Sequence, residues 1–187
     1  MAQVSTSEFK SGLKVEVEKE PYTIISNEFV KPGKGQPFNR VKLKHLITAR
    51  VVEKTFRSGE KLDIADVEEN KLRMLYKEAD GVVFMDDVSF DQVTVPFSSV
   101  EEIQHWLMEE VLYDIIFYKG MPVAVAPPTF MEMIVTETMP GIRGDTSGRV
   151  LKAATTNSGA KIQVPIFIEE GEKIKVDTRT GEYVSRV

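Results

Sequence analysis

The sequence predicts a mainly β protein built from three small antiparallel barrels in a row. Segments that alternate apolar and polar residues recur along all 187 residues, and only one stretch has a strong helical pattern. The charge also changes by thirds: 12 basic and 8 acidic residues over 1–64 (+4), 4 and 13 over 65–127 (−9), and 8 and 8 over 128–187 (0). A single large sandwich is the competing architecture. These charge shifts and a Pro-rich junction near 127 favour three domains, 1–64, 65–127 and 128–187.

The first third contains strands on either side of a glycine-rich turn. Strands are expected over 13–18, 22–30, 41–46 and 49–56, which are rich in alternating or β-branched residues. The stretch "KPGKGQPF" from Lys31 to Phe38 separates two of them and predicts a hairpin with Lys34 at its tip. Glycine permits positive φ and Pro32 fixes its own φ. Lys34 is therefore expected to point away from any core.

The middle third predicts strands and one helix. Strands are expected over 71–78, 82–87 and 88–96, with a turn at Asp80-Gly81. Ser99 and Glu102 have the spacing of a capping box. An apolar stripe then follows at helical spacing: Val100, Ile103, Leu107 and Val111. Trp106 lies beside this stripe, where a packing role is expected.

The last third predicts strands over 131–137, 161–168, 172–178 and 181–187. Pro127 and Pro128 suit a linker or the start of a strand. The loop from Pro140 to Arg149 is rich in glycine and small polar residues and carries two arginines.

Several functional classes are disfavoured. The chain has no cysteine, which excludes disulfides and cysteine-based zinc sites. No signal peptide or apolar run of ~20 residues is visible, so we expect a cytoplasmic protein without a membrane partner. His45 and His105 lie far apart in sequence and are expected to be structural or solvated. In the pairs Asp86-Asp87 and Glu101-Glu102, neighbouring carboxylates do not face each other, so neither a metal site nor a catalytic residue is expected.

A basic stretch points to RNA. Between Phe29 and Val52 the chain has no acidic residue and six basic ones: Lys31, Lys34, Arg40, Lys42, Lys44 and Arg50. Small barrels with a basic face and projecting loops suit RNA recognition by shape and backbone charge. A general OB-fold single-stranded RNA-binding protein is the alternative function. Such binders use exposed aromatic clusters, whereas the aromatic residues here are expected in the core: Phe84, Phe90, Phe97 and Phe117.

Over its whole length the sequence resembles the bacterial elongation factor P family. The resemblance is carried by "KPGKGQ", by "GDTSGR" at 144–149, by a gapped pattern from Lys152 to Gly171 that includes "IQVP", and by the terminal "GEYVSR". Pro37 departs from it, since many relatives have a small non-proline residue there. This proline should stiffen the base of the loop.

The resemblance implies a KOW/SH3-like first domain and two OB-like domains in an L-shaped, tRNA-like arrangement. It also implies a translation factor, not an enzyme, that binds the 70S ribosome between the P and E sites. There the family stabilises peptidyl-tRNA and stimulates peptide-bond formation, which relieves stalling at consecutive prolines. A monomer is expected.

The resemblance also implies the functional residues. Lys34 would be extended by a modifying enzyme, commonly with a β-lysyl group, and the sequence leaves open which group is added and whether hydroxylation follows. The residues supporting it would be Lys31, Pro32, Gly33, Gly35 and Gln36. The mRNA codon in the E site would face Gly144, Asp145 and Thr146. Tyr183 and Arg186 would contact the P-site tRNA or the small subunit. No cofactor is expected beyond the lysine extension.

Overall fold

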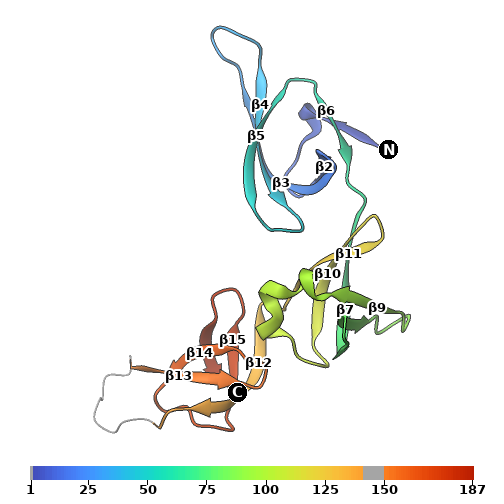
Figure 1. Cartoon of the computed structure of the whole chain (residues 1–187). Helices are drawn as coiled ribbons and strands as arrows, with labels where there is room; N and C mark the ends of the chain where they lie inside the picture. The colour runs from blue at the N-terminus through green and yellow to red at the C-terminus, as the bar shows by residue number, and fades with distance from the viewer. Residues whose placement is uncertain (1, 141–149) are drawn as a thin grey trace. The chain divides into compact units, whose positions relative to one another are not determined.

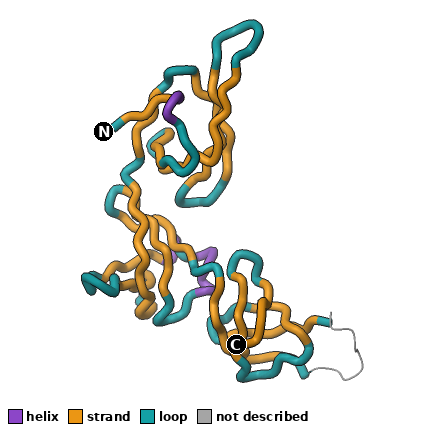
Figure 2. The backbone as a smooth tube through the Cα atoms, turned by 180° about the vertical axis from the view of Figure 1, so that it is seen from behind, coloured by secondary structure: helices purple, strands orange, loops and turns teal. Residues whose placement is uncertain are grey.

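The protein is mainly β, as the sequence predicts (Figures 1 and 2). The computed structural model describes residues 2–140 and 150–187. Its contacts divide the chain into two compact units. The first contains residues up to Asn70 with Ile115–Ala124, and the second contains Lys71–Asp114 with Val125–Val187.

The first unit contains a six-stranded antiparallel sheet in the order β1-β6-β2-β3-β4-β5. Its strands are β1 (Gln3–Ser5), β2 (Lys14–Val17), β3 (Glu20–Val30), β4 (Phe38–His45), β5 (Val51–Arg57) and β6 (Lys61–Ile64). The sequence prediction missed β1 and β6 because three or four residues are too few to show a period of two. Their pairing with each other and with β2 completes the sheet around a core of fully buried Val15, Ile24, Val41 and Leu43.

A β-bulge in β3 marks the start of the hairpin that leads to the Lys34 loop. The register of β3 against β4 shifts between Ile24 and Ser26, so Ile25 is the extra residue. A bulge bends its strand and increases the local twist. Beyond it, β3 and β4 stay paired up to Val30 and Phe38, and β5 lies alongside β4 over the same stretch, with Arg57 opposite Phe38. We call the part of β3 and β4 beyond the bulge, together with the loop that connects them, the arm. This arm is the blue hairpin at the top of Figure 1.

The arm is anchored by a chain of polar contacts. The Asn39 amide is buried, with 4 % of its surface exposed, and donates to the Asn27 side-chain oxygen at 2.8 Å. Asn27 in turn donates to the carbonyls of Thr6 (3.1 Å) and Phe9 (3.3 Å), which lie in and just after the 3₁₀ helix η1 (Thr6–Glu8). The Thr6 hydroxyl accepts the backbone N–H of Gly59 at 2.8 Å. Both strands of the arm are therefore tied to η1 and to the β5–β6 turn.

The middle strands form a five-stranded sheet in the order β11-β10-β7-β8-β9. These are β7 (Val67–Lys77), β8 (Gly81–Met85), β9 (Gln92–Pro96), β10 (Leu112–Tyr118) and β11 (Met121–Ala126). Val82, Phe84, Val95 and Tyr113 are completely buried. A side chain at Gly81 could not be accommodated, because an added Cβ would lie 2.3 Å from the Val95 carbonyl oxygen.

The β8–β9 turn corrects two of the sequence expectations. Residues 88–91 are not part of a strand, because the Asp86 carboxylate accepts the backbone N–H groups of Val88 (2.7 Å) and Ser89 (3.0 Å) and closes a turn. Phe90 has φ 62° in this turn and is 69 % exposed. Phe97 is 41 % exposed, so neither residue belongs to the core, whereas Phe84 does. The exposed Phe90 and Phe97 remove part of the argument against a general RNA binder.

The last strands form a closed barrel in the order β12-β13-β14-β16-β15. They are β12 (Phe130–Thr138), β13 (Leu151–Thr156), β14 (Lys161–Pro165), β15 (Lys173–Asp177) and β16 (Glu182–Arg186). Pro127 and Pro128 lie between β11 and β12, where the sequence predicts a linker. The barrel core includes fully buried Val164, Ile168, Ile174 and Val176. Trp106 joins this core with 6 % of its surface exposed, which confirms its packing role.

The helix in the second unit is shorter and tighter than the sequence predicts. It consists of two 3₁₀ helices, η2 (Phe97–Ser99) and η3 (Glu101–Trp106), and the Ser99 side chain caps neither. The buried Tyr113 hydroxyl donates to the Trp106 carbonyl at 2.7 Å and accepts the Met108 N–H at 2.8 Å. These two bonds end η3 at Trp106 and turn the chain toward β10. Val111 is therefore outside the helix and packs against the barrel core.

Asn39→Ala is expected to loosen the arm. It leaves the Asn27 oxygen without its donor in a part-buried position, which costs about 1–3 kcal/mol. Native-state hydrogen exchange should report this loss as a lower opening free energy for the β3 and β4 amides beyond the bulge. Asn70→Ala is the matched control, because Asn70 is exposed and its replacement should stay within ~0.5 kcal/mol. Equal exchange in the two variants would show that the amide network does not hold the arm.

Tyr113 should make the second unit sensitive to alkali. Burial raises the pKa of its hydroxyl to about 12, although the Met108 N–H opposes the shift. Because this pKa lies above the unfolded value of about 10, stability is complete below pH 10 and is lost as the pH rises toward 12. The loss should reach about 2 kcal/mol at pH 12. Urea unfolding followed by fluorescence of Trp106, the only tryptophan, measures it.

Tyr113→Phe is the comparison for this measurement. It should lose about 1–3 kcal/mol at pH 7, since two backbone groups lose their partner. It should then lose less than the parent between pH 10 and 12. Parallel alkaline losses in the two proteins would contradict the assignment.

Candidate functional site: the Lys34 hairpin

Lys34 lies at the tip of the arm, as the sequence predicts. Seven residues, 31–37, connect Val30 of β3 to Phe38 of β4, and Lys34 is the middle one. Its side chain is exposed, and among the described residues it takes part in no ion pair and no hydrogen bond. The backbone N–H of Ser58 donates to the Pro37 carbonyl at 3.3 Å, which fixes the base of the loop to the end of β5. An ammonium group is thus held in water on an anchored support.

The two glycines beside Lys34 have different roles. Gly35 has φ +112°, a conformation that side-chain-bearing residues rarely adopt. Gly33 does not have a positive φ, and an added Cβ there would meet nothing within 4 Å. Gly35 therefore turns the loop, whereas at Gly33 the backbone is merely unobstructed. The other supporting residues, Lys31, Pro32 and Gln36, are exposed or half-buried within the loop.

The outward face of β4 continues the positive charge. Arg40, Lys42 and Lys44 alternate with buried residues and are exposed. Arg40 is partly neutralised, with Glu28 at 3.8 Å and Glu53 at 3.5 Å. In the part of the chain that the structure describes, no carboxylate pairs with the remaining basic residues of the stretch: Lys31, Lys34, Lys42, Lys44 and Arg50. We call these five residues the basic cluster.

The residues expected to contact mRNA and tRNA belong to the last third of the sequence. Gly144, Asp145 and Thr146 are outside the described residues. Tyr183 is half-buried on β16 and packs against the barrel core. Arg186 has a side chain that is 60 % exposed and pairs with Glu172 at 2.9 Å. The Glu169 N–H, assisted by Arg186, holds the pKa of Glu172 below its usual value.

The two histidines lie in different surroundings. His45 accepts the N–H groups of Ile47 (3.2 Å) and Thr48 (3.1 Å) at Nδ1, so Nε2 carries the hydrogen, and a Glu20 carboxylate oxygen lies 3.3 Å from it. It is a structural residue that orders the turn after β4. His105 is exposed beside Trp106, with ring centroids 4.7 Å apart.

The carboxylates of the two acidic pairs do not converge on a shared site: Asp86 and Asp87 have different partners, and Glu101 and Glu102 are exposed. Asp87 forms a bidentate pair with Arg73 at 2.6 and 2.9 Å, which lowers the pKa of Asp87, while Asp86 closes the β8–β9 turn. Glu101 and Glu102 are exposed on η3. Within residues 2–140 and 150–187, no three acidic or histidine residues converge as metal ligands. In the same ranges no helix has the length and apolar character needed to cross a bilayer.

Asn27 and Asn39 support the site but were not singled out from the sequence. The available signal is weak: each is a polar residue at an inward-facing position of an otherwise alternating strand. Such a residue must find a hydrogen-bond partner, but the sequence does not reveal that each would find the other.

Comparison with known proteins identifies the family. Three family models match consecutive parts of the chain: the elongation factor P KOW-like domain at residues 5–62, the elongation factor P OB domain at 67–125 and the elongation factor P C-terminal domain at 131–186. The chain is 67 % identical to elongation factor P 2 of Protochlamydia amoebophila and 56 % identical to elongation factor P 2 of Chlamydia trachomatis. Each match covers 100 % of this chain and 99 % of the relative.

A solved structure supports the fold. The initiation factor 5A family protein of Naegleria fowleri aligns with a TM-score of 0.51 at 15 % identity, over 67 % of this chain and 97 % of that one. The whole-length identity is the stronger finding, and from it we conclude that this chain belongs to the elongation factor P family of translation elongation factors.

Proposed function

We propose that this protein binds the 70S ribosome between the P and E sites and assists peptide-bond formation at consecutive prolines. One observation carries the proposal: a single exposed lysine stands at the tip of a stiffened, anchored arm in a chain of the elongation factor P family. The arm brings a cation to a buried ribosomal location without bringing the bulk of the domain.

The factor would assist peptide-bond formation by orienting the peptidyl-tRNA. Proline fixes its own φ and restricts the residue before it, so a nascent polyproline chain samples few geometries suited to attack. Holding the CCA end of peptidyl-tRNA in a reactive position can lower the barrier by several kcal/mol, about 7–11 at the limit. Lys34 would contribute by contacting phosphate and sugar, which needs no proton transfer. We propose that the factor acts on the ribosome's own reaction and is not itself an enzyme.

The basic cluster would supply the rest of the contact with RNA. Lys42, Lys44 and Arg50 face solvent, and phosphate contacts of this kind position a protein without reading sequence. The carried-over residues Gly144, Asp145 and Thr146 would face the E-site codon, and Tyr183 and Arg186 the P-site tRNA or the small subunit. Tyr183 could offer only its exposed edge, because the remainder of its ring packs on the core.

We further propose that Lys34 works in an extended form. A β-lysyl group would roughly double the reach and keep a terminal cation. The exposed Lys34 and the open space beside Gly33 leave a modifying enzyme unobstructed. No other cofactor is proposed, and the factor would act as a monomer.

Replacing Lys34 should separate folding from activity. Lys34→Ala should leave stability within ~0.5 kcal/mol, because nothing in the described structure packs on the side chain. The same variant should abolish the stimulation of a Pro-Pro-Pro reporter in a purified translation system, while a proline-free reporter stays unchanged. Lys161→Ala is the control, since Lys161 is exposed on β14. Full activity from Lys34→Ala would refute the proposal.

Mass spectrometry of protein from its native host tests the extension. We expect an intact mass above that of the sequence, with the excess on the peptide that contains Lys34. Lys34→Arg, which keeps a positive charge but removes the amine to be modified, should be inactive on the polyproline reporter. An unmodified mass together with full activity would show that bare lysine is long enough.

A further inference from the structure

We infer that Phe130, Lys175 and Arg179 on the C-terminal barrel form a stacking site for an unpaired RNA nucleotide. A base would lie on the Phe130 ring, with the Lys175 ammonium beside its phosphate. This inference rests on the proposed function, because the RNA would belong to the translating ribosome. The three residues are distinct from the Lys34 hairpin and from all residues that the family resemblance assigns.

Phe130 and Lys175 share the outer face of β12 and β15, and Arg179 lies in the turn that follows β15. Phe130 pairs in register with Asp177, and Glu132 with Lys175. Their neighbours Met131 and Val176 are buried in the barrel, so the alternation of the strands directs Phe130 and Lys175 outward. Lys175 Nζ is 5.0 Å from the Phe130 ring centroid, and the central guanidinium carbon of Arg179 is 5.9 Å from it. The residue as a whole remains 46 % exposed, which leaves surface for a base.

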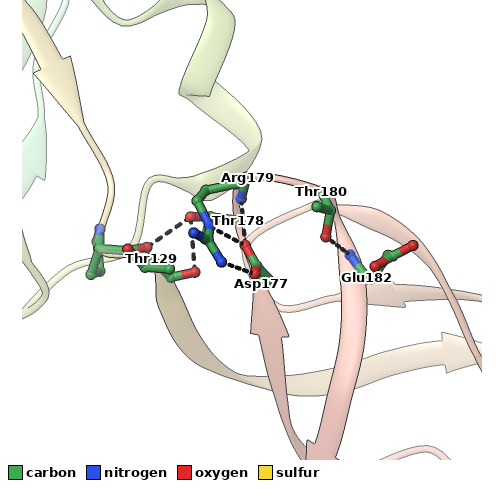
Figure 3. A network of polar contacts seen from close by, with 7 residues as sticks. Thr129, Asp177, Thr178, Arg179, Thr180 and Glu182 are labelled. Atoms are coloured by element: carbon green, nitrogen blue, oxygen red, sulfur yellow. Dashed lines mark hydrogen bonds and ion pairs between the residues drawn. The ribbon is translucent and has the colours of Figure 1, made fainter.

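Arg179 is held in place before any ligand arrives. Its Nε and Nη2 donate to the Asp177 carboxylate at 3.1 and 2.6 Å, and its backbone N–H donates to the same carboxylate at 2.9 Å. Figure 3 shows these contacts, together with the Thr178 side chain directed at Thr129. The Thr178 hydroxyl donates to the Pro128 carbonyl at 2.7 Å, which fixes the chain just before Phe130. Both edges of the site are therefore rigid.

The Asp177–Arg179 pair stays intact at neutral pH. The Asp177 side chain is only 13 % exposed, and hydrogen bonding to Arg179 lowers the pKa of Asp177 to about 2. Fixing the guanidinium in advance reduces the conformational entropy that a ligand contact would otherwise cost. The guanidinium plane can then extend the aromatic surface, as arginine does in single-stranded RNA sites.

Charge on this face is nearly balanced, which indicates the kind of RNA. Asp177 offsets Arg179, and Lys173 is paired with Glu132. Lys175 forms no ion pair within the described ranges. One cation without a carboxylate partner and a half-exposed aromatic side chain suit a single unstacked nucleotide, whose affinity comes mainly from stacking. A duplex backbone would call for many more unpaired cations.

Phe130 differs from the other exposed phenylalanines. Phe29, Phe90, Phe97 and Phe167 are between 41 % and 69 % exposed, yet in the described part of the chain no lysine or arginine lies over their rings. Single exposed apolar residues are normal on protein surfaces. An aromatic ring flanked by two cations matches both parts of a nucleotide, the base and the phosphate. Phe167, in the same barrel and 61 % exposed, provides the matched control.

Photocrosslinking on the ribosome tests the assignment. A benzoylphenylalanine is placed at position 130 or, as control, at 167 in the full-length protein. Each protein is bound to 70S ribosomes stalled on a polyproline message, and binding is checked by co-sedimentation before irradiation. We expect crosslinks from 130 to RNA and few or none from 167.

The crosslinking outcomes distinguish the hypotheses. Crosslinks from 130 to protein only, no crosslinks from a factor that co-sediments, or equal RNA crosslinking from both positions would overturn the stacking site while leaving the proposed function intact. Failure of the parent protein to co-sediment would overturn the proposed function and this inference with it.

Affinity measurements give a second, independent readout. Phe130→Ala should weaken ribosome binding roughly tenfold, within the range for loss of one stacked base, whereas Phe130→Trp should retain or improve it. Phe167→Ala should bind as the parent does. Lys175→Ala should reduce the slope of log affinity against log salt by about 0.7, the value for one phosphate contact to a single strand. Unchanged Trp106 fluorescence and urea midpoint confirm that each variant is folded. Normal affinity of folded Phe130→Ala would contradict the inference.

Discussion

The buried hydrogen bond between Asn39 and Asn27 is the contact on which the display of Lys34 depends. It joins β3 to β4 within the arm, two residues beyond the bulge on β3 and one residue from the loop end of β4. Asn27 also donates to the carbonyls of Thr6 and Phe9, which ties the arm to η1. Apolar side chains at these positions would stabilise the fold by burial, but they would not fix the orientation of the arm, because the hydrophobic effect is not directional. Amides must satisfy fixed donor and acceptor geometry. The network therefore determines where the arm points, and so where the lysine can reach.

Distance and screening explain how a chain of net charge −5 can present a basic tip. The carboxylates of Glu16, Glu18 and Glu20 lie at the far end of β3 from the loop. β3 has 11 residues, at ~3.3 Å each, so Glu20 and Val30 are separated by roughly 30 Å along the strand. This exceeds the ~8 Å screening length at physiological salt several times over. Of the carboxylates nearer the loop, Glu28 and Glu53 lie against Arg40. The distant carboxylates therefore contribute little to the electrostatic potential at Lys34.

The sequence was sufficient to predict features that depend on neighbouring residues. It did not predict features that depend on a hydrogen bond to a residue elsewhere in the chain. Alternation located most strands, and Gly35 and Pro32 located the hairpin. The spacing of Ser99 and Glu102 predicted a capped helix, but the Tyr113 hydroxyl binds the Trp106 carbonyl and ends the segment as 3₁₀. Phe90 was expected in the core, whereas hydrogen bonds from Val88 and Ser89 to the Asp86 carboxylate close a turn in which it is exposed. Neither the Tyr113 hydrogen bond nor the Asp86 hydrogen bonds can be predicted from the spacing of residues in the sequence.

The loop itself combines two opposite backbone requirements. Gly35 is needed because residues with a side chain rarely adopt φ +112°. Glycine, however, loses more conformational freedom on folding than any other residue. Proline has the reverse effect, and one at a compatible position stabilises a protein by about 0.4–1 kcal/mol because it restricts the unfolded chain. Pro32 and Pro37 stand on either side of Gly35, and the Pro37 carbonyl is held by Ser58. The loop thus keeps the positive φ of Gly35, while the two prolines and the Ser58 contact restrict the backbone around it. Such restriction favours a loop that has its binding conformation before it meets RNA.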